Sequence, residues 1–237
     1  MSNTIEAPHY RAGFRAIMSS FIHLSFDFNV IGIENLIEPP FLLTSNHLHH
    51  ADTPAFATAM PFEMYGVGAK KIQHTWLGKI FSLGSVVWVE QTEAEMQTIK
   101  QMMKVVKAGH TLALYPEGHR AKRPGMLQAK EGTAFVANRR DVPIVPAAIT
   151  GTHLFMKKVR PKVTLTVGKP FKLPSHRAKD EELKFYTEYL MCAIASMLPE
   201  DYHGFYAGNP LIERIRSHGT GLIDTLIEQG DFTTYSG

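Results

Sequence analysis

The sequence predicts an α/β fold: a mostly parallel central sheet flanked by helices, with an N-terminal amphipathic helix and a C-terminal helical tail. Short runs rich in Val, Ile, Leu and Phe alternate with stretches of helical periodicity, as parallel strands joined by helical crossovers do. An amphipathic helical period occupies the N-terminal region, and a long one lies near the C-terminus. Hydrophobic residues make up 44% of the 237 residues and charged residues 20%, which is enough for a packed core.

The N-terminal helix is predicted over Tyr10–Leu24. Such a helix either packs on the body of the protein or lies on a bilayer surface, and the two roles are compatible. In the second role Phe14 and Phe21 are the expected lipid contacts. There is no run of about 18 apolar residues and no signal pattern at the start, so we expect peripheral contact with the cytoplasmic face of a membrane. The apolar residues at helical spacing are Tyr10, Phe14, Ile17, Met18, Phe21 and Leu24.

The remaining elements follow from the same periodicities. Strands are predicted at Phe28–Ile33, Phe41–Ser45, Met64–Val67, Val86–Glu90, Thr111–Tyr115, Ile144–Ile149 and Val163–Val167. Helices are predicted at Thr53–Met60, Thr75–Ser82, Glu93–Lys107, Thr133–Asn138, Lys179–Met197 and, interrupted by two glycines, Pro210–Gln229. This order predicts an N-terminal helical segment over 1–27, an α/β domain over 28–198 and a C-terminal helical extension over 199–237.

The overall charge is mildly basic. The formal net charge is +3 and the isoelectric point is about 8.9. Such a surface suits anionic lipid or phosphate, and it falls short of the positive charge typical of nucleic-acid-binding proteins. The single cysteine, Cys192, excludes an internal disulfide and lies in an apolar helical stretch, where we expect it to fill the core. The expected location is the cytoplasm, and the oligomeric state is left open.

The first group of reactive side chains follows a predicted strand, in Asn46-His-Leu-His-His-Ala-Asp52. If the carboxylate of Asp52 meets the ring of His47, it fixes the imidazole tautomer, and the other ring nitrogen can take a proton from a hydroxyl. Two other interpretations fit. Asp52 could cap the following helix, or the pair could bind a metal ion with His49 and His50. No distant Cys/His cluster completes such a set, so no metal is predicted.

A second polar loop, Tyr115-Pro-Glu-Gly-His-Arg120, follows another predicted strand. Gly118 lets the backbone approach a ligand closely, and the planar guanidinium of Arg120 suits phosphate. Glu117 could orient Arg120 or hold a hydroxyl. The alternative is a solvated basic loop, which the buried strand before it disfavours. Further positive charge follows at Lys122 and Arg123.

With a third block, Val142-Pro-Ile-Val-Pro146, these loops resemble the glycerolipid acyltransferase family, typified by lysophosphatidic acid acyltransferase. The three blocks stand in the family's order, and the likeness extends roughly from Asn29 to Phe171. The resemblance implies transfer of a fatty acyl group from acyl-CoA or acyl-acyl carrier protein to a hydroxyl of a lysophospholipid or related acceptor. It also implies attachment to membranes and no cofactor beyond the acyl thioester, which acts as co-substrate.

The resemblance also implies residue roles. His47 becomes the general base and Asp52 its partner. Glu117, Gly118 and Arg120 become acceptor-binding residues, commonly for a phosphate. The Pro143–Pro146 segment then lies near the acyl donor or shapes the site.

The sequence departs from the family pattern at two places. Gln91 stands where the family usually has an arginine that grips the acceptor phosphate, and His119 replaces a usual threonine. Replacing a cation by a neutral amide removes a charge-assisted contact. Nearby lysines and Arg123 could compensate, or the acceptor is another alcohol or amine. The alternative functions are therefore a catalytically altered acyl-lipid-binding protein on the same fold, a thioesterase, and a metal-dependent hydrolase.

Overall fold

The computed structural model describes residues 5–11, 13–89, 95–121 and 124–235. Within these residues the central sheet has seven strands in the order β1-β7-β6-β2-β5-β3-β4. Neighbouring strands run parallel, except that β6 and β7 are antiparallel. The predicted α/β class with a mostly parallel sheet is confirmed. The strands are β1 (Asp27–Ile31), β2 (Leu42–Ser45), β3 (Tyr65–Ala69), β4 (Val86–Val89), β5 (Leu112–Leu114), β6 (Ile144–Thr150) and β7 (Lys162–Val167).

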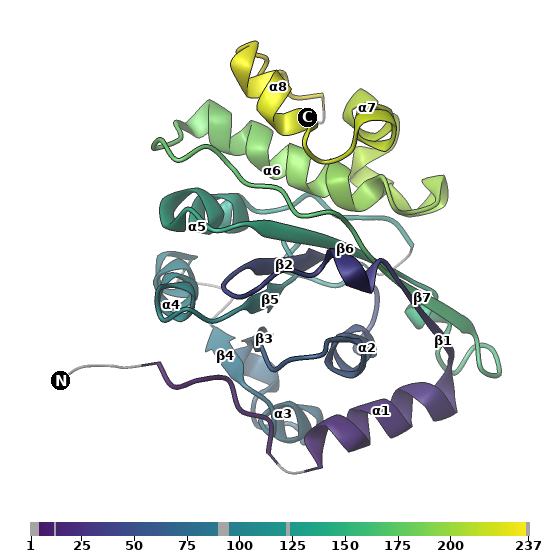
Figure 1. The fold of residues 1–237 in the computed structure, drawn as a ribbon. Coiled ribbons are helices and arrows are strands. Elements are labelled where there is room, and N and C mark those ends of the chain that lie inside the picture. Colours follow the sequence, from purple (N-terminus) through teal and green to yellow (C-terminus); the bar gives the residue numbers. More distant parts are fainter. Residues whose placement is uncertain (1–4, 12, 90–94, 122–123, 236–237) are drawn as a thin grey trace.

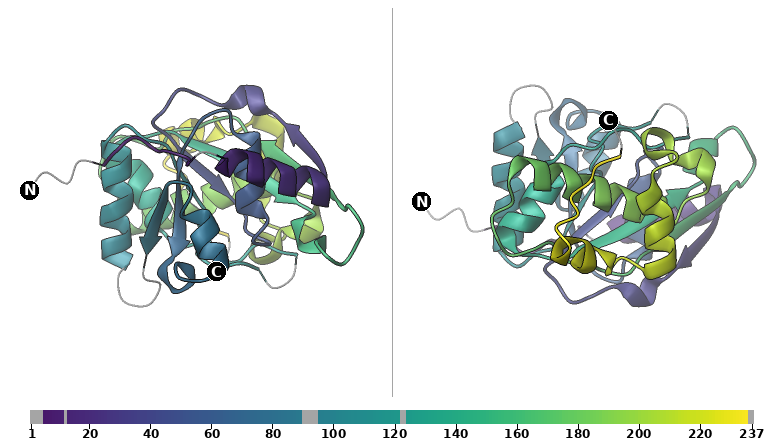
Figure 2. Two further views of the ribbon diagram at one scale, coloured as in Figure 1. Left: turned by 90° about the horizontal axis from the view of Figure 1, so that it is seen from below. Right: turned by 90° about the horizontal axis from the view of Figure 1, so that it is seen from above.

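Helices cover both faces of the sheet (Figure 1). α1, α2 and α3 lie on one side, and α5 and α6 lie on the other. α7 and α8 form a further layer on α6, and the view from above in Figure 2 shows the segment after α8 passing over α6. The helices are α1 (Phe14–Ser25), α2 (Asp52–Ala59), α3 (Trp76–Phe81), α4 (Glu95–Lys107), α5 (Gly132–Arg140), α6 (Asp180–Ala195), α7 (Pro210–His218) and α8 (Leu222–Glu228).

Each face of the sheet has its own hydrophobic cluster, because successive strand residues point to opposite faces. Leu43 and Val145 pack with residues of α1 and α2. Leu42 and Ile144, one position earlier in the same two strands, pack with α4, α5 and α6. β6 is buried continuously from Ile144 to Ile149, since helices cover it on both sides. This explains the unbroken apolar run from which the strand was predicted.

The N-terminal helix begins later than predicted. It starts at Phe14, because Gly13 has a left-handed backbone (φ 85°) that interrupts the helical path from Tyr10. Phe14 is buried against α2 and α3, so it cannot be the lipid contact that the sequence indicated. The exposed apolar side chains of α1 are Ile17 and Leu24, which are 50% and 77% exposed.

The first strand is shorter than predicted. It ends at Ile31 rather than Ile33, because Gly32 turns the chain with φ 75° into a short 3₁₀ helix, Ile33–Asn35. A side chain at position 32 would collide with the carbonyl oxygen of Val167 on β7. The other described elements agree with their predicted bounds to within a few residues.

The C-terminal segment packs onto the domain. As the two glycines indicated, its helical period divides into α7 and α8. Leu211, Ile215 and Leu226 are buried in the same hydrophobic cluster as α6. The hydroxyl of Tyr189 on α6 donates to the carbonyl of Thr220 between the two helices, at 2.7 Å. The division of the chain at 27/28 and 198/199 stays a prediction.

The topology brings several loops to one edge of the sheet. β2, β5, β3 and β6 run parallel to one another, so their carboxyl ends meet at the same edge. The His47 loop follows β2, the Glu117 loop follows β5, and the β6–β7 connection follows β6. Among the described residues, no helix is long and apolar enough to cross a membrane.

Candidate active site

The structure brings together the His47–Asp52 pair that the sequence predicted. Nδ1 of His47 lies 2.8 Å from Oδ2 of Asp52. A carboxylate accepts hydrogen bonds, so Nδ1 carries the proton in the neutral ring and Nε2 keeps a lone pair. Asp52 is fully buried, whereas the side chain of His47 is 15% exposed. The pair therefore has a buried anchor and a basic nitrogen available to a substrate.

Asp52 is held by the loop that precedes it. Its Oδ2 also accepts the backbone N–H groups of Leu48, at 2.7 Å, and His49, at 2.9 Å. α2 begins at Asp52, yet this carboxylate does not cap the helix; it turns back onto residues 47–49. The helix-cap interpretation is therefore wrong for this side chain. The same contacts that wrap the loop around Asp52 aim the ring of His47.

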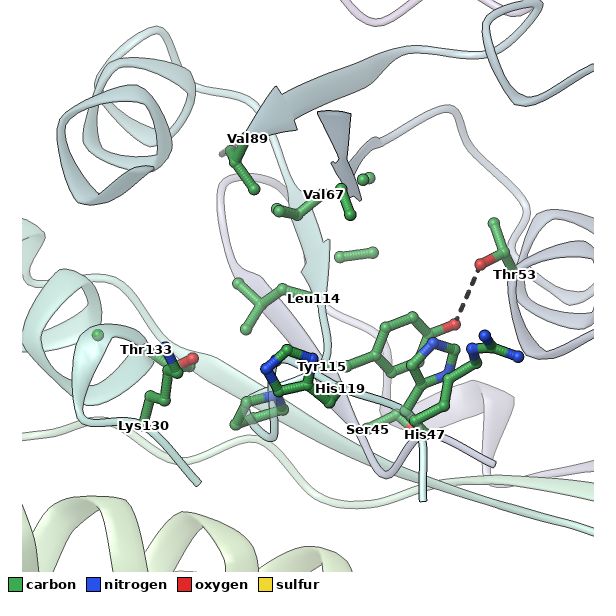
Figure 3. A pocket seen from close by; sticks show the side chains of 18 of the residues that line it. Ser45, His47, Thr53, Val67, Val89, Leu114, Tyr115, His119, Lys130 and Thr133 are labelled. Carbon is green, nitrogen blue, oxygen red and sulfur yellow. Dashed lines mark hydrogen bonds between the residues drawn. The ribbon is translucent and has the colours of Figure 1, made fainter. Parts of the chain in front are cut away.

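Tyr115, immediately after β5, fixes the plane of the histidine ring. The two rings are stacked, with centroids 3.8 Å apart and planes 6° apart. Figure 3 shows this stack at the cavity wall, with the hydroxyl of Tyr115 beside Thr53 of α2, at 3.4 Å. The stack therefore holds the ring of His47 in one orientation at the cavity wall. Burial raises the pKa of Tyr115, which keeps the phenol neutral.

Glu117 joins the two polar loops. It is 2% exposed; its Oε1 accepts the backbone N–H of His47 at 2.9 Å, and its Oε2 accepts that of Leu127 at 2.7 Å. Burial raises the pKa of Glu117 to about 7. The negative charge of Asp52 acts in the same direction, and the two backbone hydrogen bonds oppose the rise. With both oxygens engaged by the protein, Glu117 holds the backbone at His47 in place.

Gly118 and Arg120 lie on the cavity wall beside His47. Gly118 has φ 68°, and its backbone N–H donates to the carbonyl of Tyr115 at 3.0 Å, closing the turn. The side chain of Arg120 is exposed. The stem of Lys130 lies against Gly118, where an added Cβ would sit 3.7 Å from it. Lys122, Arg123, Glu90 and Gln91 lie outside the described residues.

Among the described residues, no carboxylate forms a hydrogen bond or an ion pair with either of the other two histidines of the loop. Burial, together with the positive charge of Arg120, lowers the pKa of His50 to about 4. Burial also lowers the pKa of His49, whose Nδ1 accepts the N–H of Ala51 at 3.2 Å. Both are therefore neutral near pH 7. In the described parts of the chain, no three His, Cys, Asp or Glu side chains are placed to hold a metal ion.

A cavity of about 1580 Å³ opens beside His47. That exceeds the roughly 300–1,000 Å³ of sites for drug-sized ligands. Its walls come from both faces of the sheet. Leu43, Phe56, Met64, Gly66 and Phe81 line the part on the face covered by α1, α2 and α3, here called the α2-side arm. Val67, Leu114, Met102, Lys130, Glu131 and Thr133 line the part toward α4 and α5, here called the α5-side arm.

Sequence reasoning did not assign roles to Tyr115, Lys130 or Thr133. Tyr115 was visible as an aromatic residue between a strand and Pro116, but nothing in the pattern indicated that its ring stacks on His47. Lys130 lies ten residues beyond Arg120 and returns to the site because its N–H bonds the carbonyl of Pro116 at 3.0 Å. In Figure 3, Lys130 and Thr133 line the cavity on the far side of His119 from His47.

Comparison with known proteins finds curated relatives of this chain. A 1-acyl-sn-glycerol-3-phosphate acyltransferase of Cocos nucifera is 31% identical over 56% of this chain and 46% of its own length. One of Bacillus subtilis is 26% identical over 66% of this chain and 81% of its own. The chain spans about half the length of the plant relatives that it matches.

A solved structure and a family model also match the chain. The crystal structure of the 1-acyl-sn-glycerophosphate acyltransferase PlsC from Thermotoga maritima matches with a TM-score of 0.55 and 22% identity, over 73% of this chain and 75% of that one. This likeness supports the fold. The acyltransferase family model matches residues 27–150, just over half of the 237 residues, and includes the His47–Asp52 and Glu117–Arg120 blocks. The chain therefore belongs to the acyltransferase family, as its three sequence blocks predicted.

Proposed function

We propose that this protein transfers a fatty acyl group from an acyl thioester to a hydroxyl, with His47 as general base and Asp52 as its partner. The observation that carries the proposal is the 2.8 Å contact between Nδ1 of His47 and the buried carboxylate of Asp52, at the wall of a large cavity. This arrangement leaves Nε2 as the ring nitrogen for the substrate. The names of the relatives support acyl transfer to a lysophosphatidic acid type of acceptor.

The chemical step needs no covalent enzyme intermediate. The acceptor oxygen attacks the thioester carbonyl carbon while Nε2 of His47 takes the hydroxyl proton. A C–O bond forms and a tetrahedral oxyanion develops. The C–S bond then breaks, and the imidazolium returns its proton to the leaving thiolate. Asp52 favours the positive charge that His47 carries between these two events.

The oxyanion requires hydrogen-bond donors at the cavity wall. The N–H of Gly118 is engaged by Tyr115, so it is a poor candidate. The backbone N–H groups of His119 and Arg120 donate to no residue in the described part of the chain, and both residues line the cavity. We propose these amides, together with the guanidinium of Arg120, as the groups that face the developing charge.

Glu117 is proposed as a positioning residue for His47, because both of its oxygens bind backbone N–H groups. The acceptor phosphate is proposed to lie against Arg120, with Lys122 and Arg123 as further predicted contacts. Lys130 adds a cation to the same cavity. The donor carrier, coenzyme A or acyl carrier protein, remains open in this proposal.

The acyl chain is proposed to occupy the α2-side arm. His47 bonds Asp52 at the start of α2 and lines the cavity, so it lies beside that arm. The walls there are apolar, with Phe56, Met64 and Phe81 all buried. The α5-side arm includes charged side chains and suits the polar parts of the substrates.

The test offers acyl-CoAs of several lengths with lysolipids and simple alcohols, and identifies products by mass spectrometry. A positioned base contributes about 10²–10⁴ in rate, so His47→Ala should lower kcat by that factor and leave the melting temperature nearly unchanged. Unchanged acyl transfer by that variant would refute the assignment. Equally fast thiol release without acceptor identifies a thioesterase, and binding of acyl-CoA without any thiol release identifies an acyl-lipid-binding protein.

A further inference from the structure

The connection between β6 and β7 exposes two apolar side chains at its tip. Met156 is 87% exposed and Val159 is 97% exposed, more than any other large apolar side chains of the described chain. Lys157 and Lys158 lie between them, and both are exposed. Exposed apolar residues at the tip of a loop, interleaved with cations, are typical of a surface that meets a lipid interface.

The charge of this connection has one sign. Arg160 and Lys162 add to the two lysines, and no acidic residue occurs between Thr150 and Lys162. Asp27, which pairs with Lys162 in the sheet register, is the acidic residue at the base of the connection. A cluster of four cations beside two apolar side chains is complementary to a bilayer that carries anionic headgroups.

Two residues of this connection adopt backbone angles that are unfavourable for their residue types. Met156 has φ 61° and Arg160 has φ 42°, and a left-handed backbone is unfavourable for residues other than Gly, Asn and Asp. Glycine at either position would relieve that cost. Instead the chain has an apolar side chain and a cation at the two strained positions, which are the side-chain types that a lipid surface requires.

The tip is continuous with the exposed flank of α1. The ring of Phe155 packs edge-on against Phe21 of α1, with centroids 5.4 Å apart. Ile17 and Leu24 are exposed on that helix. Figures 1 and 2 both show the connection projecting beyond the carboxyl end of α1. α1 supplies apolar area but little free charge, since Arg15 donates to the carbonyl of Ala57 on α2.

The connection is also close to the active site. β6 runs parallel to β2, so the segment after β6 leaves the sheet at the edge where His47 lies. The ring of Phe155 lies 5.8 Å from that of His49, two residues beyond His47. A surface docked through this connection would therefore lie beside the loop that carries the catalytic base.

We propose that Met156–Arg160 and the Ile17–Leu24 flank of α1 together form a docking surface for an anionic lipid bilayer. The apolar side chains enter the headgroup region and the lysines contact the anionic headgroups, while Arg160 donates to the carbonyl of Phe26 at 3.4 Å and ties the connection to the start of β1. The proposal extends the proposed function, because it brings a lipid acceptor to the edge of the sheet where His47 lies. It needs no catalysis, so it can fail or succeed independently.

The test measures flotation of the full chain with vesicles of phosphatidylcholine alone, or with half of it replaced by phosphatidylglycerol. Binding is expected mainly to the anionic vesicles and should weaken with added salt. Each cation near an anionic surface is worth roughly fivefold in affinity, so the double variant Lys157→Gln, Lys158→Gln should bind about 25-fold more weakly. Met156→Asn should bind about tenfold more weakly, while asparagine tolerates the left-handed backbone and keeps the fold.

The matched control is the double variant Lys104→Gln, Lys107→Gln. It removes the same charge from exposed positions of α4 near the opposite edge of the sheet, and it should bind like the unmodified chain. His47→Ala should also bind normally. If both lysine double variants lost the same amount of vesicle binding, net charge alone would account for the loss and the proposal would be overturned. Unchanged vesicle binding in the loop variants would also overturn the proposal. The same holds if those variants lost binding only to a soluble polyanion such as RNA.

Discussion

One oxygen of Asp52 accepts from three groups, namely the ring of His47 and the backbone N–H groups of Leu48 and His49. The other oxygen, Oδ1, is buried without a hydrogen-bond partner among the described residues. Burying a carboxylate with one oxygen unpaired costs free energy. A neutral acceptor would avoid this cost, so under the proposed function we expect the charge of Asp52 itself to be needed for catalysis.

Asp52→Asn tests this requirement. The amide either turns its NH₂ toward Nδ1, which favours the wrong tautomer of His47, or keeps its oxygen there and loses the charge that stabilises the imidazolium. We expect kcat to fall by about 10²–10⁴ with a melting temperature equal to or above that of the unmodified chain. Steady-state kinetics and thermal melts measure both. His218→Gln, at an exposed histidine of α7, serves as the control, and full activity in Asp52→Asn would contradict the prediction.

Glu117 predicts a pH-dependent stability. Its pKa is about 7 in the folded protein against 4.5 in the unfolded chain, so between these values the folded state binds more protons. Stability from this group is therefore present below pH 4.5 and is lost as the pH rises toward 7, by roughly 3 kcal/mol in total.

Glu117→Gln isolates that contribution, since glutamine resembles the protonated acid. Because only the unmodified chain loses this contribution as the pH rises, the variant should gain unfolding free energy relative to the unmodified chain between pH 5 and pH 8. Its amide cannot accept from both the His47 and Leu127 N–H groups, so kcat at pH 8 should fall by roughly ten- to a hundredfold through misplacement of His47. Urea titrations at both pH values measure the stability, and a difference that is the same at both would count against the pKa assignment.

At the scale of elements, periodicity predicted nearly every helix and strand, because apolar spacing reports which face is buried. It failed where a single backbone angle decided the boundary. Gly13 delays the first helix and Gly32 ends the first strand, and both have a positive φ that the residue type permits but does not require. For the candidate site, the sequence likewise predicted a contact between nearby residues and missed one between distant residues. His47 and Asp52 are close in sequence and were predicted together, whereas the contact of Glu117 with the His47 N–H spans 70 residues and required the parallel pairing of β2 with β5.

β3 supplies a test of where the acyl chain lies. Gly66 lines the α2-side arm, and a Cβ built there meets no atom within 4 Å. Gly66→Leu should therefore fold, since the space beside Gly66 is open and a glycine within a strand weakens it, but the leucine should fill the arm. Each methylene excluded costs about 0.8 kcal/mol, or roughly fourfold, so kcat/KM for long acyl chains should fall relative to short ones.

Val67→Phe is the matched variant, because Val67 faces the α5-side arm from the same strand. If the acyl chain lies in the α2-side arm, this change should leave the ratio of long-chain to short-chain kcat/KM unaltered. A shift in that ratio with Val67→Phe, and none with Gly66→Leu, would place the chain in the other arm.

The whole molecule has two distinct regions, namely the edge of the sheet where the carboxyl ends of the strands meet and the face of the sheet that α6 covers. The loops that carry His47 and Glu117 gather at the carboxyl edge of the sheet, while α6, α7 and α8 stack on the face away from α1 and α2. Asp180 and Leu183 of α6 line the cavity, whereas no described residue of α7 or α8 does. The buried residues of α7 and α8 join the cluster that contains Leu114, directly before Tyr115, so they support the strand on which the stack with His47 depends.

This arrangement predicts that residues 199–237 unfold together with the sheet. Leu226 of α8 is fully buried, and Leu226→Ala should lower the free energy of unfolding by about 2–5 kcal/mol. Trp76 and Trp88 lie on α3 and β4, far along the sheet from α8, so their fluorescence reports on the opposite region. Fluorescence and far-ultraviolet circular dichroism should shift together in the variant, because one hydrophobic cluster connects α8 to the sheet.

Thr225→Ala, at an exposed position of the same helix, should change stability by less than about 0.5 kcal/mol. If Leu226→Ala instead produced an early transition seen only by circular dichroism, the C-terminal segment would be an independent extension.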